Sequence, residues 1–220
     1  MQAVLSRLIC MTVILMGLSF VGAYAREYPI NELPMYGGQY DPDVPQNKKF
    51  SEDAANLGWK YYNSGDMDTA IKRFNQAWML DRENPDAYWG FGIVMGQRSR
   101  TEDTEKNLDE SIKFIGIANS KMPHDVRILT DLAFSHTVKG EFLQLNKRPY
   151  GNEYNMARKL YQEAESANEK YALLYFNWSS LELADGKCQE AVRLNGKALS
   201  AGMPTDARYE KELLACNAGK

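Results

Sequence analysis

A three-residue pattern recurs four times along the chain and constrains its fold more than any other feature. Each copy has a small residue, a bulky residue four positions later and an alanine three positions after that. The copies are Ala70–Phe74–Ala77, Ser111–Ile115–Ala118, Ala157–Tyr161–Ala164 and Ala191–Asn195–Ala198, the last with a polar residue at the bulky position. Offsets of four and seven residues lie on one face of an α-helix. The pattern therefore predicts four helices that each bury such a face.

The spacing of the copies predicts a repeating unit. They begin at positions 70, 111, 157 and 191, which are 41, 46 and 34 residues apart. A period of 34 residues is typical of a helix–turn–helix repeat, and the longer gaps indicate insertions of about 7 and 12 residues. Polar stretches at 98–106 and 146–155 can hold these insertions. We therefore expect a stack of helical hairpins.

Each patterned helix is preceded by another helical stretch. The first is expected to begin at Ser51, where a capping hydroxyl is followed by two acidic residues, and to end near Gly65. The others are expected from residue 85, over 124–139, with Gly140 at its end, and over 171–184. A last helix over 206–216 is expected to cover the open end of the stack, because a terminal repeat otherwise exposes apolar surface.

Several of these positions together resemble the tetratricopeptide-repeat signature. The matching residues are Leu57–Gly58, Tyr61, Gly65, Ala70, Phe74, Ala77 and Pro85. The chain departs from the family at Ala54, where Trp is frequent, and in its longer second and third units. The resemblance implies an all-α fold, a right-handed α-solenoid of about four helical hairpins plus a C-terminal capping helix, within 51–220. The chain also resembles exported bacterial members of unknown function, which share a Leu-Pro-Met-Tyr-Gly stretch, here 33–37.

The resemblance also implies where a partner would bind. In that family the first helix of each hairpin lines a concave inner wall. By that rule the partner-binding residues are Trp59, Tyr62, Asn63, Trp89, Ile93, Gln97, Arg127, Thr130, Phe134 and Phe176. We expect Trp59, Tyr62 and Trp89 to be exposed contacts, because such rings desolvate large areas at interfaces. The other interpretation is that these aromatic residues form core between repeats.

The N-terminal 50 residues divide into two segments. Residues 1–25 have one early positive charge, an apolar stretch and a final Ala-Tyr-Ala, which is typical of a cleaved signal peptide. They predict a periplasmic or secreted protein, or one held near the membrane if the segment stays uncleaved. Residues 26–50 hold four prolines and are expected to form an extended arm. This arm could pack on the helices, occupy the groove or act as a flexible spacer.

Two cysteines, Cys188 and Cys216, remain after the predicted signal peptide. An even number in an exported chain permits one disulfide, which would join the last hairpin to the capping helix. Two free buried thiols are the alternative.

The remaining composition argues against an enzyme. The net charge is −3 without a basic block, which makes nucleic acid a poor partner. The two histidines are 12 residues apart and form no metal-binding pattern, and no Gly-x-Ser-x-Gly motif is present. We therefore expect no cofactor, no metal and a protein or peptide partner. The alternative is a peptidoglycan- or glycan-associated envelope factor that uses the aromatic groove as a sugar platform.

Overall fold

The computed structural model describes residues 27–38 and 44–218. Within these ranges two short 3-10 helices precede nine α-helices, and no strand is present. The elements are η2 (Ile30–Glu32), η3 (Pro34–Gly38), α2 (Lys48–Asn63), α3 (Met67–Leu80), α4 (Pro85–Arg98), α5 (Thr104–Lys121), α6 (Val126–Leu145), α7 (Gly151–Ala167), α8 (Ala172–Ala184), α9 (Cys188–Ser200) and α10 (Ala207–Ala218). The predicted signal peptide, 1–25, lies outside the described residues.

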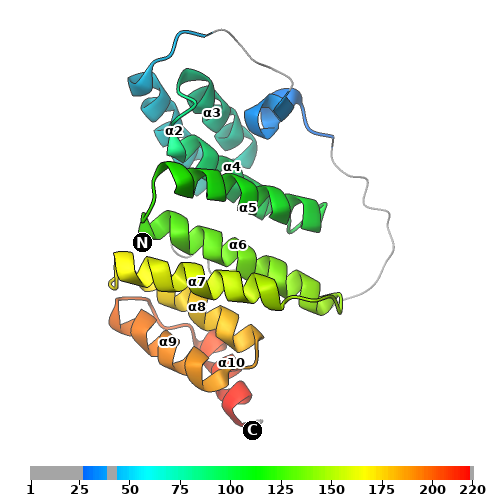
Figure 1. Cartoon of the computed structure of the whole chain (residues 1–220), viewed down its shortest axis with the longest axis vertical. Helices are drawn as coiled ribbons and strands as arrows, with labels where there is room; N and C mark the ends of the chain where they lie inside the picture. The colour runs from blue at the N-terminus through cyan, green and yellow to red at the C-terminus, as the bar shows by residue number, and fades with distance from the viewer. Residues whose placement is uncertain (1–26, 39–43, 219–220) are drawn as a thin grey trace.

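The helices pair in chain order into four hairpins, which are α2/α3, α4/α5, α6/α7 and α8/α9. Figure 1 shows them stacked along the long axis of the molecule, with α10 packed on the last hairpin. The predicted all-α solenoid of four hairpins with a C-terminal capping helix is confirmed.

The first helices of the hairpins form one layer of the stack. α2 packs directly on α4, α4 on α6, and α6 on α8. The second helices α3, α5 and α7 pack back onto the next first helix instead. We call α2, α4, α6 and α8 the inner layer. In a curved solenoid, the helices that pack directly on one another from repeat to repeat lie on the concave side.

Three glycines allow neighbouring helices to pack closely. A Cβ atom on Gly58 of α2 would lie 2.6 Å from the Phe74 ring, and one on Gly90 of α4 would lie 2.4 Å from it. The ring is fully buried between the two backbones. Gly92 gives Ile115 of α5 the same room. Gly90 and Gly92 therefore allow α4 to pack closely against α3 and α5.

Two predicted helix boundaries differ from the structure by three residues or more. α2 begins at Lys48, because the side chain of Asn47 accepts a hydrogen bond from the Phe50 amide at 3.0 Å. Ser51 is instead buried and donates to the Ala77 carbonyl of α3 at 2.7 Å. The predicted end at Gly140 is wrong, since α6 continues to Leu145. Gly140 lies inside the helix where the Tyr154 ring of α7 packs against its backbone.

Residues 27–38, here called the arm segment, pack on the second helix of the first hairpin. The Asn75 side chain of α3 donates to the carbonyls of Asn31 at 3.0 Å and Leu33 at 2.8 Å. Arg98 at the end of α4 donates to the Glu32 carbonyl at 2.8 Å. The Glu32 carboxylate pairs with Lys72 at 2.9 Å. This end of the stack is therefore held by polar contacts.

The opposite end is held by a covalent bond. Cys188 at the start of α9 forms a disulfide with Cys216 of α10. Beside it, the hydroxyls of Tyr209 and Ser179 share a hydrogen bond of 2.7 Å, and Ser179 also donates to the Ala191 carbonyl at 2.7 Å. α10 is thus joined to both helices of the last hairpin.

Candidate binding surface

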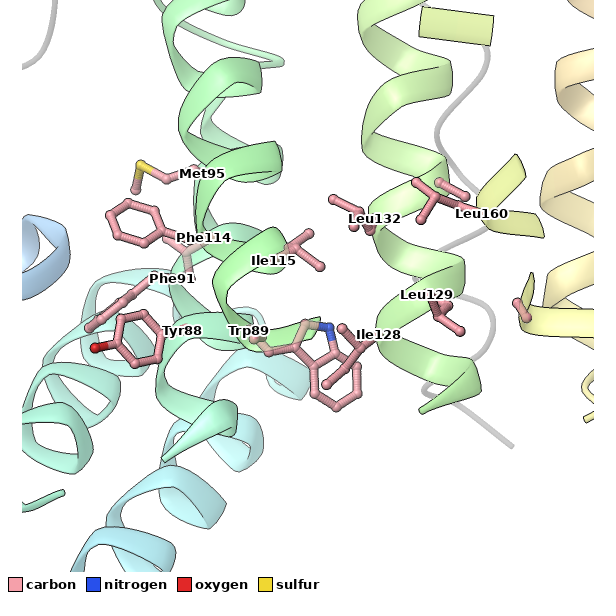
Figure 2. Packing of buried hydrophobic residues seen from close by; sticks show 14 of the residues in the cluster. Tyr88, Trp89, Phe91, Met95, Phe114, Ile115, Ile128, Leu129, Leu132 and Leu160 are labelled. Carbon is pink, nitrogen blue, oxygen red and sulfur yellow. The ribbon is translucent and has the colours of Figure 1, made fainter. Parts of the chain in front are cut away.

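The inner layer is the candidate binding surface, and its first half is an enclosed aromatic cluster. Trp59 of α2 lies 4.6 Å from Trp89 of α4 and 5.0 Å from Phe74, ring centre to ring centre. Trp59 is half-buried, whereas Tyr62 is only 8% exposed and Trp89 only 6%. Figure 2 shows Trp89 reaching from α4 toward Ile128 of α6. The expected exposure is therefore wrong for Tyr62 and Trp89, because successive inner helices pack over them.

Each indole of this cluster is tied to the next inner helix. The Trp59 N–H donates to Asp86 of α4 at 3.0 Å, and the Trp89 N–H donates to Asp131 of α6 at 2.9 Å. A buried indole N–H needs such an acceptor. The two tryptophans therefore connect the first three repeats.

The remaining predicted residues of α2 and α4 are mixed. Gln97 donates to the Tyr62 hydroxyl at 3.1 Å, so its amide is already engaged within the chain. Ile93 is half-buried and Asn63 is exposed. The surface that these two helices offer is consequently smaller than the sequence predicts.

On α6 the predicted residues divide between core and surface. Thr130 is fully buried and donates to the Val126 carbonyl of its own helix at 2.6 Å, so its placement on an accessible wall is wrong. Arg127 is half-exposed, lies over the Trp89 ring at 5.2 Å and pairs with Asp125 at 2.6 Å. Hydrogen bonding to Asp125 raises the pKa of Arg127. Phe134 is half-buried and remains a candidate contact.

Sequence reasoning missed two further positions on α6. Val138 and Glu141 follow Phe134 at offsets of four and seven residues, and both are half-buried. Burial raises the pKa of Glu141 to about 7. Helical spacing from Arg127 would have found Glu141, which lies two heptads further along the same stripe.

The last inner helix offers the least open surface. Phe176 of α8 is half-buried, and its ring centre lies 5.1 Å from that of Tyr209 in the capping helix. Ser180 is buried and donates to the Phe176 carbonyl at 3.2 Å. Half-buried apolar residues therefore remain on each inner helix, and α6 contributes Phe134 and Val138.

The arm segment does not lie on this surface. It borders a cleft of about 780 Å³ between the arm segment and the α4/α5 hairpin. The cleft is lined by Leu33 and Met35 of the arm segment, Met95 of α4 and Phe114 of α5, among other residues. In the described part of the chain, Met35 therefore packs against the second helices and does not fill the groove.

Comparison with known proteins identifies the architecture. No family model matches the chain, and no curated protein matches it in sequence. Among solved structures, the chain is similar to the crystal structure of TTC0263, a thermophilic tetratricopeptide-repeat protein of Thermus thermophilus. The match has a TM-score of 0.53 at 16% identity and covers 77% of this chain and 89% of that one. The fold is a tetratricopeptide-repeat fold.

Two searches of the described residues gave no match. Within 27–38 and 44–218, no group of three or more His, Cys, Asp or Glu side chains is placed to hold a metal ion. None of the helices in these ranges has the length and apolar character needed to cross a membrane.

Proposed function

We propose that this tetratricopeptide-repeat protein is a non-catalytic scaffold that binds a segment of a partner protein along its inner layer. The observation that carries the proposal is the half-buried stripe of α6, Phe134–Val138–Glu141, on the inner layer. Solenoids of this kind present extended concave surfaces that suit elongated ligands. Partly accessible apolar residues on a rigid surface are what a docking peptide can bury.

Rigidity supports the proposal. The indole–aspartate hydrogen bonds of Trp59 and Trp89 fix the first three inner helices relative to each other. In the second half, Arg158 of α7 donates to both carboxylate oxygens of Glu182 of α8 at 2.8 Å. A surface that is already fixed loses little conformational entropy on binding, so more of the contact energy appears as affinity.

We further propose that the protein is exported. The pattern of residues 1–25 supports this, as does the Cys188–Cys216 disulfide, since such bonds persist in oxidising compartments. Intact-mass measurement of the native protein tests it. A mass that corresponds to cleavage after Ala25, with no free thiol, is expected.

The glycan-binding alternative gains no support from the predicted aromatic platform of Trp59, Tyr62 and Trp89. A sugar platform needs an aromatic ring with one open face. Trp89 and Tyr62 are buried, and the neighbouring rings of Phe74 and Trp89 contact Trp59. We therefore favour a protein partner.

Photo-crosslinking in intact cells tests the scaffold function. A photoreactive amino acid at Val138 is expected to capture a defined protein that mass spectrometry identifies. The same group at Met156, which is 44% exposed on α7, serves as the control. Capture of the same proteins with equal yield from both positions would show that the inner layer is not the binding surface.

A further inference from the structure

Glu141 differs from the other buried or half-buried carboxylates of the inner layer. Asp86 and Asp131 accept hydrogen bonds from tryptophans, and Glu182 is paired with Arg158 and accepts from the Trp178 indole at 2.9 Å. Within the described part of the chain, the Glu141 side chain takes part in no hydrogen bond or ion pair. A carboxylate that is largely removed from water normally has such a partner.

Neighbouring side chains place Glu141 at the junction of α6 with α7 and α8. Thr137, one turn earlier, lies 3.4 Å from the Tyr161 hydroxyl of α7. Gln144, one turn later, donates to the Ala184 carbonyl of α8 at 3.5 Å and accepts from the Tyr154 hydroxyl at 3.0 Å. Glu141 lies between these two positions and keeps part of its surface exposed.

The charged and titratable groups around Glu141 do not neutralise it. Tyr154 and Tyr161 of α7 and Tyr209 of α10 are the groups whose pKa values its charge raises further. From α8, Glu182 faces the same region and is already paired with Arg158. Burial alone raises the pKa of Glu141 to about 7, with no cation to oppose it.

We propose that the junction of α6 and α8 is a docking position for a lysine or arginine side chain of the bound partner, with Glu141 as its counter-ion. Charge complementarity carries the inference, since an unpaired carboxylate in a desolvated site gains most from a cation. Phe134 and Val138, which precede Glu141 on the same stripe, would contact the alkyl part of that side chain. The inference rests on the proposed scaffold function and specifies the partner's chemistry.

The proposal predicts how binding depends on pH. A cation pairs with the ionised form of Glu141, so binding must displace the proton that the free protein holds below pH 7. Affinity is therefore expected to rise about tenfold between pH 6 and pH 8, the change in ionised fraction for a group that titrates near 7. The affinity of a basic ligand for a carboxylate that is already fully ionised at pH 6 would not rise between pH 6 and pH 8.

Two capped pentapeptides serve as probes, Ac-Ala-Leu-Lys-Leu-Ala-NH2 and the same peptide with norleucine in place of lysine. Binding is followed by NMR shifts of the folded, disulfide-bonded protein at pH 6 and pH 8. We expect the lysine peptide to shift α6 and α8 resonances and to bind Glu141→Gln about tenfold more weakly at pH 8. Glu52→Gln is the matched control, because this exposed α2 carboxylate carries the same charge far from the junction.

Equal binding of the two peptides, or full affinity in Glu141→Gln, overturns the proposal. Shifts confined to other helices also overturn it. These failures are distinct from failure of the scaffold function, which the Val138 and Met156 crosslinks test separately. If a protein captured through Val138 binds Glu141→Gln as tightly as the parent protein, the scaffold function stands and the proposed cation site is wrong.

Discussion

The α2–α5 half of the solenoid is closed by polar contacts from the arm segment, whereas the α6–α10 half is closed by a disulfide. In the first half, the inner-layer carboxylates Asp86 and Asp131 both accept hydrogen bonds, from Trp59 and Trp89. The second half leaves Glu141 without a partner among the described residues. The two halves therefore differ in how their ends are held and in the pairing of their half-buried inner-layer carboxylates, and they should respond to different perturbations.

The largest expected effect belongs to the covalent end. Replacing Cys188 and Cys216 by serine opens a cross-link over a sequence separation of 28 residues. Loop-closure entropy predicts that the free energy of unfolding falls by about 3–4 kcal/mol. Amide hydrogen exchange should show the loss in α9 and α10, with the arm segment unchanged. Equal loss of protection in α10 and in the arm segment would show that the two ends of the solenoid are not stabilised independently.

Gly90→Ala should be the most damaging substitution in the first half. Its Cβ would lie 2.4 Å from the Phe74 ring, which is fully buried and cannot move aside. Overpacking of this kind costs about 2–3 kcal/mol. Gly116→Ala on α5 is the control, because nothing lies within 4 Å of its added Cβ. That variant should be more stable by about 0.5–1 kcal/mol. Urea denaturation followed by circular dichroism measures both, and a stable Gly90→Ala protein would show that the α3–α4 packing is adjustable.

The sequence predicted the core of both halves well. The small and bulky pattern positions of the first three copies are 0–1% exposed. In the fourth copy the polar Asn195 remains partly exposed, and Leu194, one position earlier, is fully buried instead. These outcomes follow from helical periodicity, which is a local property of the chain.

The binding surface was predicted less well, because it depends on how successive hairpins rotate relative to each other. Trp89 became core through contact with Asp131, 42 residues away. In the sequence, Gly140 is compatible with the end of a helix or with an aromatic ring packed against the helix backbone. The position of Tyr154 decides for the second. Neither contact has a local signature in the sequence.

The stability of the second half should depend on pH through Glu141. The folded-state pKa of Glu141 is about 7, above its ordinary value of 4.5, so the folded protein holds a proton that the unfolded chain releases earlier. Protein with Glu141 therefore loses stability relative to Glu141→Gln as pH rises from 4.5 to 7, and the difference stays constant above pH 7. We expect Glu141→Gln to be more stable by about 2 kcal/mol at pH 8, allowing for partial exposure, and equal at about pH 4. Thermal melting of both proteins from pH 4 to pH 8 measures this difference. A difference that does not change with pH would show that Glu141 is not an unpaired carboxylate.

The smallest expected effect concerns the arm segment. Asn75→Ala removes the amide that donates to the Asn31 and Leu33 carbonyls. The cost should be only about 1 kcal/mol, because the Asn75 side-chain oxygen is buried and accepts no hydrogen bond from the described residues, so its removal offsets part of the loss. Amide exchange in residues 30–36 should quicken several-fold while α8–α10 stay protected. Asn56→Ala, at an exposed position of α2, is the control. If exchange in the arm segment stays slow in Asn75→Ala, Arg98 and Lys72 suffice to hold it, and the polar closure of this end is more redundant than the single disulfide at the other.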